Sequence, residues 1–172
     1  MSKQFLVALS DTTSDTVLAR AIDTARAHGA SLTVLHVVDP APYLAMTSDY
    51  TCGLLFESLE ASGLETAHRF AHALDKANYH ATIHTAMLSI GETTVARKIA
   101  SFAEAIGASL IIVGARKSRW PSWLCANVAA GIQHATATPL QVVPQSIAPA
   151  SARAPSPAQP GTARQYAVHH RP

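Results

Sequence analysis

Short apolar runs separated by helix-like segments make up most of this chain, and this alternation constrains the fold more than any other feature. The runs at residues 5–9, 31–38 and 110–113 are dominated by aliphatic residues and are bounded by turn residues. Runs of this kind are typical of strands that are buried on both faces of a sheet. Between the first two runs, apolar residues recur at helical spacing over residues 17–25. Strand, helix and strand in that order predict a parallel βαβ unit with a right-handed crossover.

The same alternation continues to residue 143. Further strands are expected at residues 79–88, which alternate in polarity, and at 139–143. Helices are expected up to His28, over 54–77 with a bend at Gly63, over 92–106, and from about 127 to 136; residues 41–53 are expected to be irregular. The sequence therefore predicts a single Rossmann-like α/β domain with a five-stranded parallel sheet and helices on both faces.

Composition divides the chain into a domain at residues 1–144 and a tail at 145–172. The tail is rich in Ala, Pro and Ser and has no periodic apolar residues. Such a segment cannot bury enough surface to offset its ordering entropy, so a disordered tail is expected. Its three arginines would allow contact with an anionic partner, but a solvated tail is the favoured interpretation.

Charge and cysteine content limit the functional class. The formal charge of +2 becomes −1 without the tail arginines Arg153, Arg164 and Arg171. A nearly neutral domain argues against binding to nucleic acid. No apolar run approaches the roughly 20 residues that span a bilayer, and the run at residues 5–9 is too short for a signal-peptide core and lacks a cleavage-like segment, so a cytoplasmic location is expected. There, Cys52 and Cys125 are expected to be reduced thiols.

Residues 110–128 form the stretch that carries the functional prediction. An aliphatic strand ends at a turn at Gly114, three cations follow at Arg116, Lys117 and Arg119, and a helix begins near Asn127. Ligands of open parallel sheets bind just past the carboxyl ends of strands, where helix amides face outward. An anion site and an ordinary solvated loop are both compatible with these cations. The tryptophans at 120 and 123 are interpreted as packing over the loop rather than stacking on a base.

Motifs of catalysis and of metal binding are weak or missing. The sequence contains no nucleophile elbow of the Gly-x-Ser-x-Gly type, no Walker lysine motif and no His-Glu-x-x-His. His68 and His72 are spaced four residues apart, and a metal site with His80 or His84 is one interpretation. An exposed helix face requires fewer assumptions. We therefore expect neither an enzyme nor a metal protein, and His36 is expected to be buried.

Four segments of the chain together resemble the sequence pattern of a known protein family. They are residues 5–11 with Thr13, residues 27–40, residues 105–116 and residues 133–143. In this order and at these distances they resemble the universal stress protein family over residues 4–143. The resemblance implies the adenine nucleotide alpha hydrolase-like form of the α/β fold and a homodimer through the last strand, Pro139 to Val143. An apolar strand at a sheet edge agrees with such pairing, since exposed edges are usually covered.

The resemblance also implies a test for ATP binding. Members that bind ATP carry a glycine, two residues, a second glycine, nine residues, and then glycine followed by serine or threonine. Gly114 keeps the first position, but Lys117 stands at the second. The final pair is replaced by Ala126-Asn127 or by Asn127-Val128, depending on the alignment. A non-glycine residue at a position that needs positive φ is disfavoured by about 1–2 kcal/mol.

The adenine side of the implied site is better preserved. Asp11 matches the acidic residue that follows the first strand of the family, and Val37 matches the apolar residue that lies against the base. Asp11 is equally interpretable as a helix N-cap, and Val37 as core packing. The sequence therefore predicts a non-catalytic stress-response binding or regulatory module with weakened or lost ATP binding. The alternative is an adenine-nucleotide-binding protein whose basic loop replaces the glycines.

Overall fold

Five strands and five helices are described in the computed structural model, which covers residues 3–10, 15–44, 52–88, 94–115 and 128–144. The strands are β1 (Gln4–Leu9), β2 (Ser31–Val38), β3 (Thr82–Met87), β4 (Leu110–Gly114) and β5 (Leu140–Val143). The helices are α1 (Asp15–His28), α2 (Ala41–Leu44), α3 (Cys52–Lys76), α4 (Val95–Ala105) and α5 (Val128–Ala135). The tail predicted at 145–172 lies outside the described residues.

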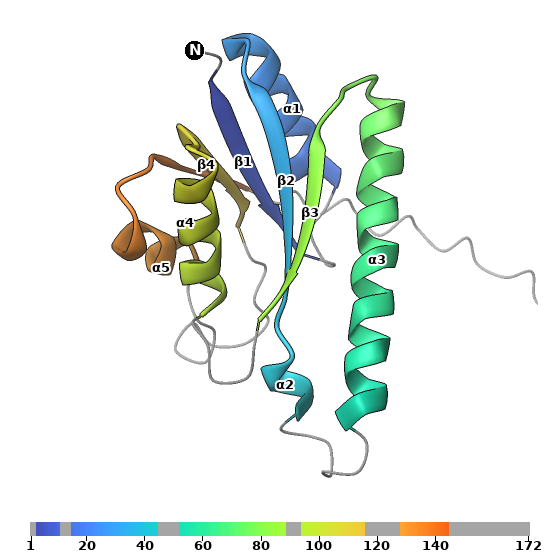
Figure 1. The fold of residues 1–172 in the computed structure, drawn as a ribbon. Coiled ribbons are helices and arrows are strands. Elements are labelled where there is room, and N and C mark those ends of the chain that lie inside the picture. The colour runs from blue at the N-terminus through green and yellow to red at the C-terminus, as the bar shows by residue number, and fades with distance from the viewer. Residues whose placement is uncertain (1–2, 11–14, 45–51, 89–93, 116–127, 145–172) are drawn as a thin grey trace, which may run out of the picture.

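All five strands are parallel, in the order β3-β2-β1-β4-β5 (Figure 1). The pairing is long in range, since Phe5 of β1 lies opposite Leu32 of β2 and opposite Leu110 of β4. Parallel strands direct all their carboxyl ends to one edge of the sheet. Helix α2 and the first turns of α3 extend beyond that edge (Figure 1). The predicted five-stranded parallel α/β fold is confirmed.

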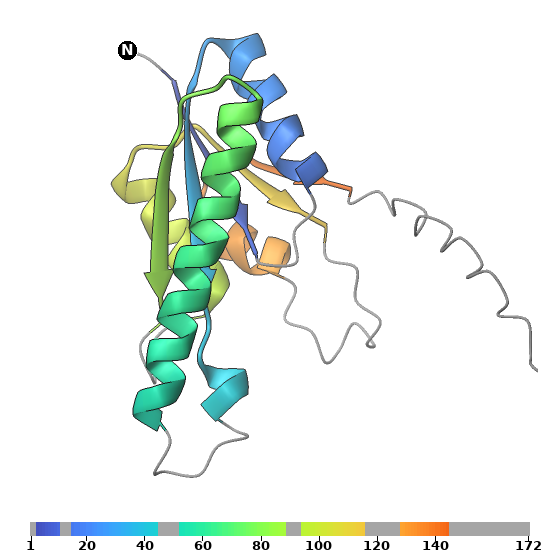
Figure 2. The ribbon, with the colours of Figure 1, turned by 90° about the vertical axis from the view of Figure 1, so that its right-hand side faces the viewer.

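Each face of the sheet has its own hydrophobic core. Alternate residues of β1 belong to different cores: Phe5 and Val7 pack with α1 and α3, whereas Leu6 packs with α4 and α5. The two pairs of helices lie on opposite sides of the sheet, as Figures 1 and 2 show together. Because both faces of the central strands are buried, those strands are continuous apolar runs in the sequence.

Three helices end in the same way before the next strand begins. The last turns of α1 and α4 are closed by Gly29 and Gly107, whose φ values are +58° and +62°. In each case the following residue donates a backbone hydrogen bond back to the helix, Ala30 to Ala25 at 2.9 Å and Ala108 to Ala103 at 2.8 Å. Both glycine ends were predicted from the sequence. Asn78, with φ of 47°, closes α3 in the same manner.

Two details of the predicted fold are wrong. The segment expected to be irregular over 41–53 contains helix α2, whose first amide, that of Ala41, donates to Asp39 Oδ1 at 3.0 Å. Gly63 was expected at a bend, but α3 is a single helix through it. A Cβ at Gly63 would lie 3.2 Å from Thr85 Cγ2, so the glycine allows α3 to approach the sheet.

A second close approach involves Gly131 and predicts a measurable effect on stability. A Cβ on Gly131 of α5 would lie 2.6 Å from the Cβ of Ala96 in α4, so α5 must move in Gly131→Ala. We expect overpacking of about 1–3 kcal/mol to exceed the gain in helix propensity of about 1 kcal/mol, so the free energy of unfolding falls. Urea denaturation measures this change.

The matched control is Gly53→Ala in α3, where no atom lies within 4 Å of the added Cβ. That substitution should leave stability unchanged or raise it by up to about 1 kcal/mol. Adding Ala96→Gly to Gly131→Ala should recover part of the loss. If the two substitutions proved additive, with no favourable coupling, the close packing of α4 and α5 would not be the cause.

Candidate functional site

The strand order places a topological switch point between β1 and β4, and we call the region outside the carboxyl ends of these two strands the crevice. The chain winds outward from β1 to β2 and β3 in one direction, and from β4 to β5 in the other. The helices on the two sides of this switch therefore leave the sheet on opposite faces. In open parallel sheets, ligands bind outside the carboxyl ends of the strands at such a switch point. The residues next to this crevice are Leu9, the last residue of β1, with Ser10 after it, and Gly114, the last residue of β4, with Ala115 after it.

Backbone pairing shows where the two strands part. The ladder between β1 and β4 ends at Ala8 with Val113. Beyond this pair, β1 continues only with β2, and β4 continues with β5 through Gly114 opposite Val143. The amide of Ala115 then donates to the carbonyl of Val143 at 2.7 Å. The backbone on each side of the crevice is thus held by its outer neighbour.

Three of the predicted binding residues lie at this edge of the sheet. Gly114 is the last residue of β4, and Val37 is the penultimate residue of β2. Val128 is the first residue of α5, one position after the helix start expected near Asn127. Val37 and Val128 are both half-buried, and both pack against the core on the α4 side of the sheet. The structure therefore places residues of β2, β4 and α5 near the carboxyl ends of the strands.

The remaining predicted binding residues lie outside the described part of the chain. They are Asp11, Arg116, Lys117, Ala126 and Asn127. Trp120 and Trp123, for which packing over the loop was predicted, are outside it as well. Their roles stay predictions. The structure describes the residues next to them in the chain, which are Ser10 before Asp11, Ala115 before Arg116, and Val128 after Asn127.

His36 is a polar residue at the crevice that no motif indicated. It lies in β2 directly opposite Leu9 and is only 5% exposed, as the sequence predicted. A carbonyl can only accept, so the 3.1 Å contact between His36 Nδ1 and the Leu9 oxygen is a hydrogen bond that the imidazole donates. The ring meets Phe70 of α3 edge-on, with centroids 6.2 Å apart. The only sequence signal was one histidine within an aliphatic run.

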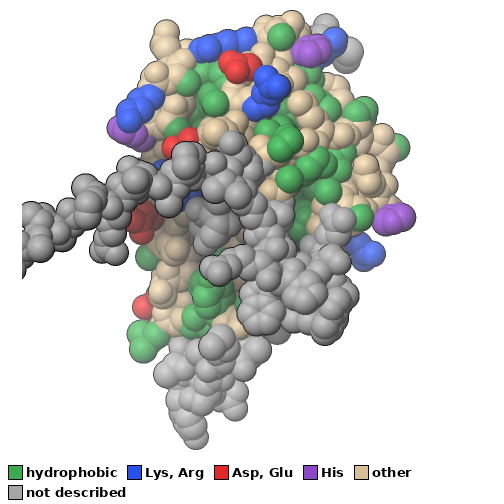
Figure 3. All heavy atoms as spheres, turned by 180° about the vertical axis from the view of Figure 1, so that it is seen from behind, with side chains coloured by type: hydrophobic (Ala, Val, Ile, Leu, Met, Phe, Trp, Pro, Cys, Tyr) green, Lys and Arg blue, Asp and Glu red, His purple; other side chains and the backbone are tan. Residues whose placement is uncertain are grey.

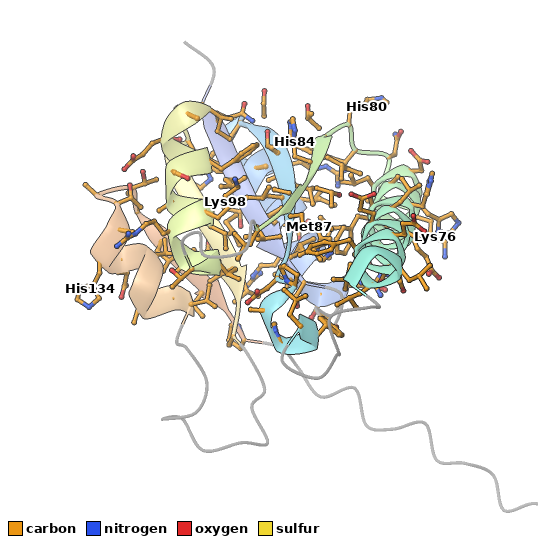
Figure 4. The ribbon with its side chains drawn as sticks, turned by 60° about the horizontal axis from the view of Figure 1, so that its bottom comes forward. Lys76, His80, His84, Met87, Lys98 and His134 are labelled. Atoms are coloured by element: carbon orange, nitrogen blue, oxygen red, sulfur yellow. The ribbon has the colours of Figure 1, made fainter. Side chains whose placement is uncertain are left out.

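The other histidines do not form a site among the described residues. His68 and His72 are exposed on α3, and His134 on α5 lies on the opposite side of the view from His80 (Figure 4). His84 packs against the ring of Phe102, with centroids 5.1 Å apart. Within the described ranges, no group of three His, Cys, Asp or Glu side chains is placed to hold a metal ion.

The face of the molecule seen from behind carries charged side chains of both signs (Figure 3). Seen from behind, Lys and Arg lie apart from one another, with Asp and Glu among them (Figure 3). None of the helices among the described residues has the length and the hydropathy that crossing a bilayer requires.

Comparison with known proteins assigns the chain to a family. The model of the universal stress protein family matches residues 1–144. This chain belongs to that family. A search of curated proteins gives no match.

Solved structures of the family share the fold at low sequence identity. A universal stress family protein from Burkholderia pseudomallei is 22% identical with a TM-score of 0.63, over 83% of this chain and 96% of its own. One from Archaeoglobus fulgidus in complex with dAMP is 19% identical with a TM-score of 0.57, over 81% and 96%. Another in complex with cAMP is 18% identical with a TM-score of 0.56, over 85% and 100%. These similarities show the α/β fold.

Proposed function

We propose that this universal stress protein is a cytoplasmic, dimeric binding or regulatory module that acts without catalytic turnover and with weakened or lost ATP binding. The proposal rests on a contrast between two features. The strands and helices provide the position of a nucleotide site, but the sequence of residues 116–127 lacks the glycines of a phosphate-binding loop. Val37 and Gly114 lie near the carboxyl ends of β2 and β4, and Val128 begins α5, which supports a site at the switch point. The loop of residues 116–127 that joins them contains no glycine.

The lack of glycine should weaken binding of the phosphate chain more than binding of the adenine base. A phosphate chain is bound by backbone amides, and glycine lets that backbone come close and adopt positive φ. Lys117 at the second glycine position adds a side chain and a backbone cost of about 1–2 kcal/mol where positive φ is needed. Trp120, Pro121 and Trp123 add further bulk and stiffness. ATP, with three phosphates, depends most on this loop.

A second function remains open, in which an adenine nucleotide binds through Asp11, Val37, Gly114 and the helix start at Asn127. In that case the positive charges of Arg116 and Lys117 neutralise the phosphate and compensate for the lost contacts with backbone amides. Two of the structurally similar proteins were solved with dAMP and with cAMP, each of which has a single phosphate. A nucleoside monophosphate needs less of the loop than ATP does, so AMP is the form that this alternative favours.

Calorimetric titration separates the two functions. With magnesium present, we expect ATP to show no saturable binding below roughly 1 mM, since a loss of a few kcal/mol converts micromolar into millimolar affinity. AMP is titrated in parallel, and Asp11→Ala is the variant that tests the adenine side. Stoichiometric nucleotide released on denaturation, or a micromolar Kd for ATP that Asp11→Ala abolishes, would contradict the leading proposal. Release of ADP over many turnovers would contradict the non-catalytic assignment.

Partial repair of the loop gives a directional prediction. Lys117→Gly removes the side chain and restores positive φ, so ATP should bind about 5- to 30-fold more tightly, matching 1–2 kcal/mol. Lys117→Ala is the control, since it removes the bulk and the charge without restoring positive φ. If alanine improved ATP affinity as much as glycine, backbone conformation would not be what weakens the site.

The proposed dimer is tested at the β5 edge. Val142 of β5 is 44% exposed although it is an apolar residue in an edge strand. Pairing of β5 with its copy in a second chain would cover it, and a lysine there would meet its own symmetry mate. We expect Val142→Lys to sediment as a monomer and the control Val142→Thr to stay a dimer. An unchanged dimer in Val142→Lys would exclude this interface.

A further inference from the structure

The pairing of β1 with β2 is secured by a side-chain hydrogen bond at each end. At the amino end, Gln4 Nε2 donates to Thr33 Oγ1 at 2.6 Å. At the carboxyl end, His36 Nδ1 donates to the Leu9 carbonyl at 3.1 Å. Thr33 and His36 are both less than 6% exposed; the bond to Thr33 is partly buried and that of His36 is buried. The two bonds lie at opposite ends of the β1–β2 pair, and only that of His36 adjoins the crevice.

The His36 bond acts where β1 has lost one of its neighbours. The ladder with β4 ends at Ala8, one residue before Leu9, whereas the ladder with β2 reaches Leu9 opposite His36. At Leu9, the last residue of the strand, β1 pairs within the sheet with β2 alone. A donated hydrogen bond to the last carbonyl of the strand therefore restrains the backbone that leads into Ser10 and Asp11.

The imidazole is itself held in place by α3. Phe70 is only 2% exposed and meets the His36 ring edge-on, at an interplanar angle of 71°. A buried imidazole without a partner is disfavoured relative to an apolar side chain. The bond to Leu9 offsets that penalty, and the contact with Phe70 limits rotation of the ring. The end of β1 is thereby connected, through His36 and Phe70, to helix α3 on the face of the sheet that α1 also covers.

We infer that His36 is a positioning residue, which fixes the carboxyl end of β1 at Leu9, beside the switch point between β1 and β4. The inference rests on the proposed function in one respect, that this crevice is where the ligand binds. A preformed backbone lowers the ordering cost of binding, whichever adenine nucleotide or other small anion the altered loop accepts. The role needs no contact between His36 and the ligand.

Two nearly isosteric substitutions separate the hydrogen bond from packing. Asn carries an amide nitrogen at about the place of His Nδ1, so His36→Asn keeps the donor. His36→Leu has the same branching and keeps the apolar contact without the donor. Thr33→Val is the control, because it removes a buried side-chain hydrogen bond from the other end of the same strand. All three are compared with wild type by amide hydrogen exchange followed by NMR.

In His36→Leu, we expect the amides of Leu9, Val37 and Val38 to exchange about tenfold faster, while Val34 changes by less than threefold. In Thr33→Val the faster exchange should lie at the amino end instead. His36→Asn should return the carboxyl-end amides to within threefold of wild type. Equal acceleration at both ends in His36→Leu, or failure of asparagine to restore protection, would overturn the inference.

Titration with AMP and magnesium adds the functional readout. Where wild type binds AMP, His36→Leu should weaken binding about tenfold, and both His36→Asn and Thr33→Val should stay within threefold. Unchanged AMP affinity in His36→Leu would overturn the positioning role. Absence of AMP binding in wild type would contradict the nucleotide alternative alone, and the exchange pattern would then decide the role of His36.

Discussion

Strand β1 lies at the centre of the sheet, and its two sets of hydrogen bonds are the constraint on which the rest of the structure depends. It pairs in parallel with β2 and with β4, and its residues Phe5, Leu6 and Val7 are at most 3% exposed. Each neighbour continues outward through its own crossover helix. The chain must therefore change direction beside β1, and the crevice follows directly from that change. The position of the candidate site is a consequence of topology and does not depend on residues 116–127.

The sequence predicts the fold well because burial on both faces leaves a strong pattern. A strand such as β2 is a continuous apolar run, whereas β3 at the sheet edge alternates, with Thr82 and His84 exposed. The helix ends at Gly29 and Gly107 are equally local signals. The errors have non-local causes. Helix α2 is too short for apolar periodicity to reveal it, and Gly63 could not be understood without knowing that Thr85 lies against α3.

The site was predictable only in part. The position of Val37, Gly114 and Val128 at the carboxyl edge follows from the order of strands, and the structure agrees. The roles of Asp11 and of the 116–127 loop come from family resemblance and stay predictions. His36 could not be recognised as part of the site, because a histidine in an aliphatic run is also the pattern of an ordinary buried core residue. Its partner, the Leu9 carbonyl, is identified only by the register of β1 and β2.

The frame of the site is stabilised by groups that a phosphate would not use. The end of β4 is bonded to β5 through Ala115 and Val143, and α5 is located by the close approach of Gly131 to Ala96. Neither contact involves the residues between 116 and 127. Loop sequence can therefore change without loss of the fold, while the crevice stays where topology puts it. This separation is compatible with the proposed function, in which Lys117 stands at a glycine position of the family pattern while the fold is kept. Ligand affinity and fold stability should accordingly vary independently, the first with the loop and the second with the frame.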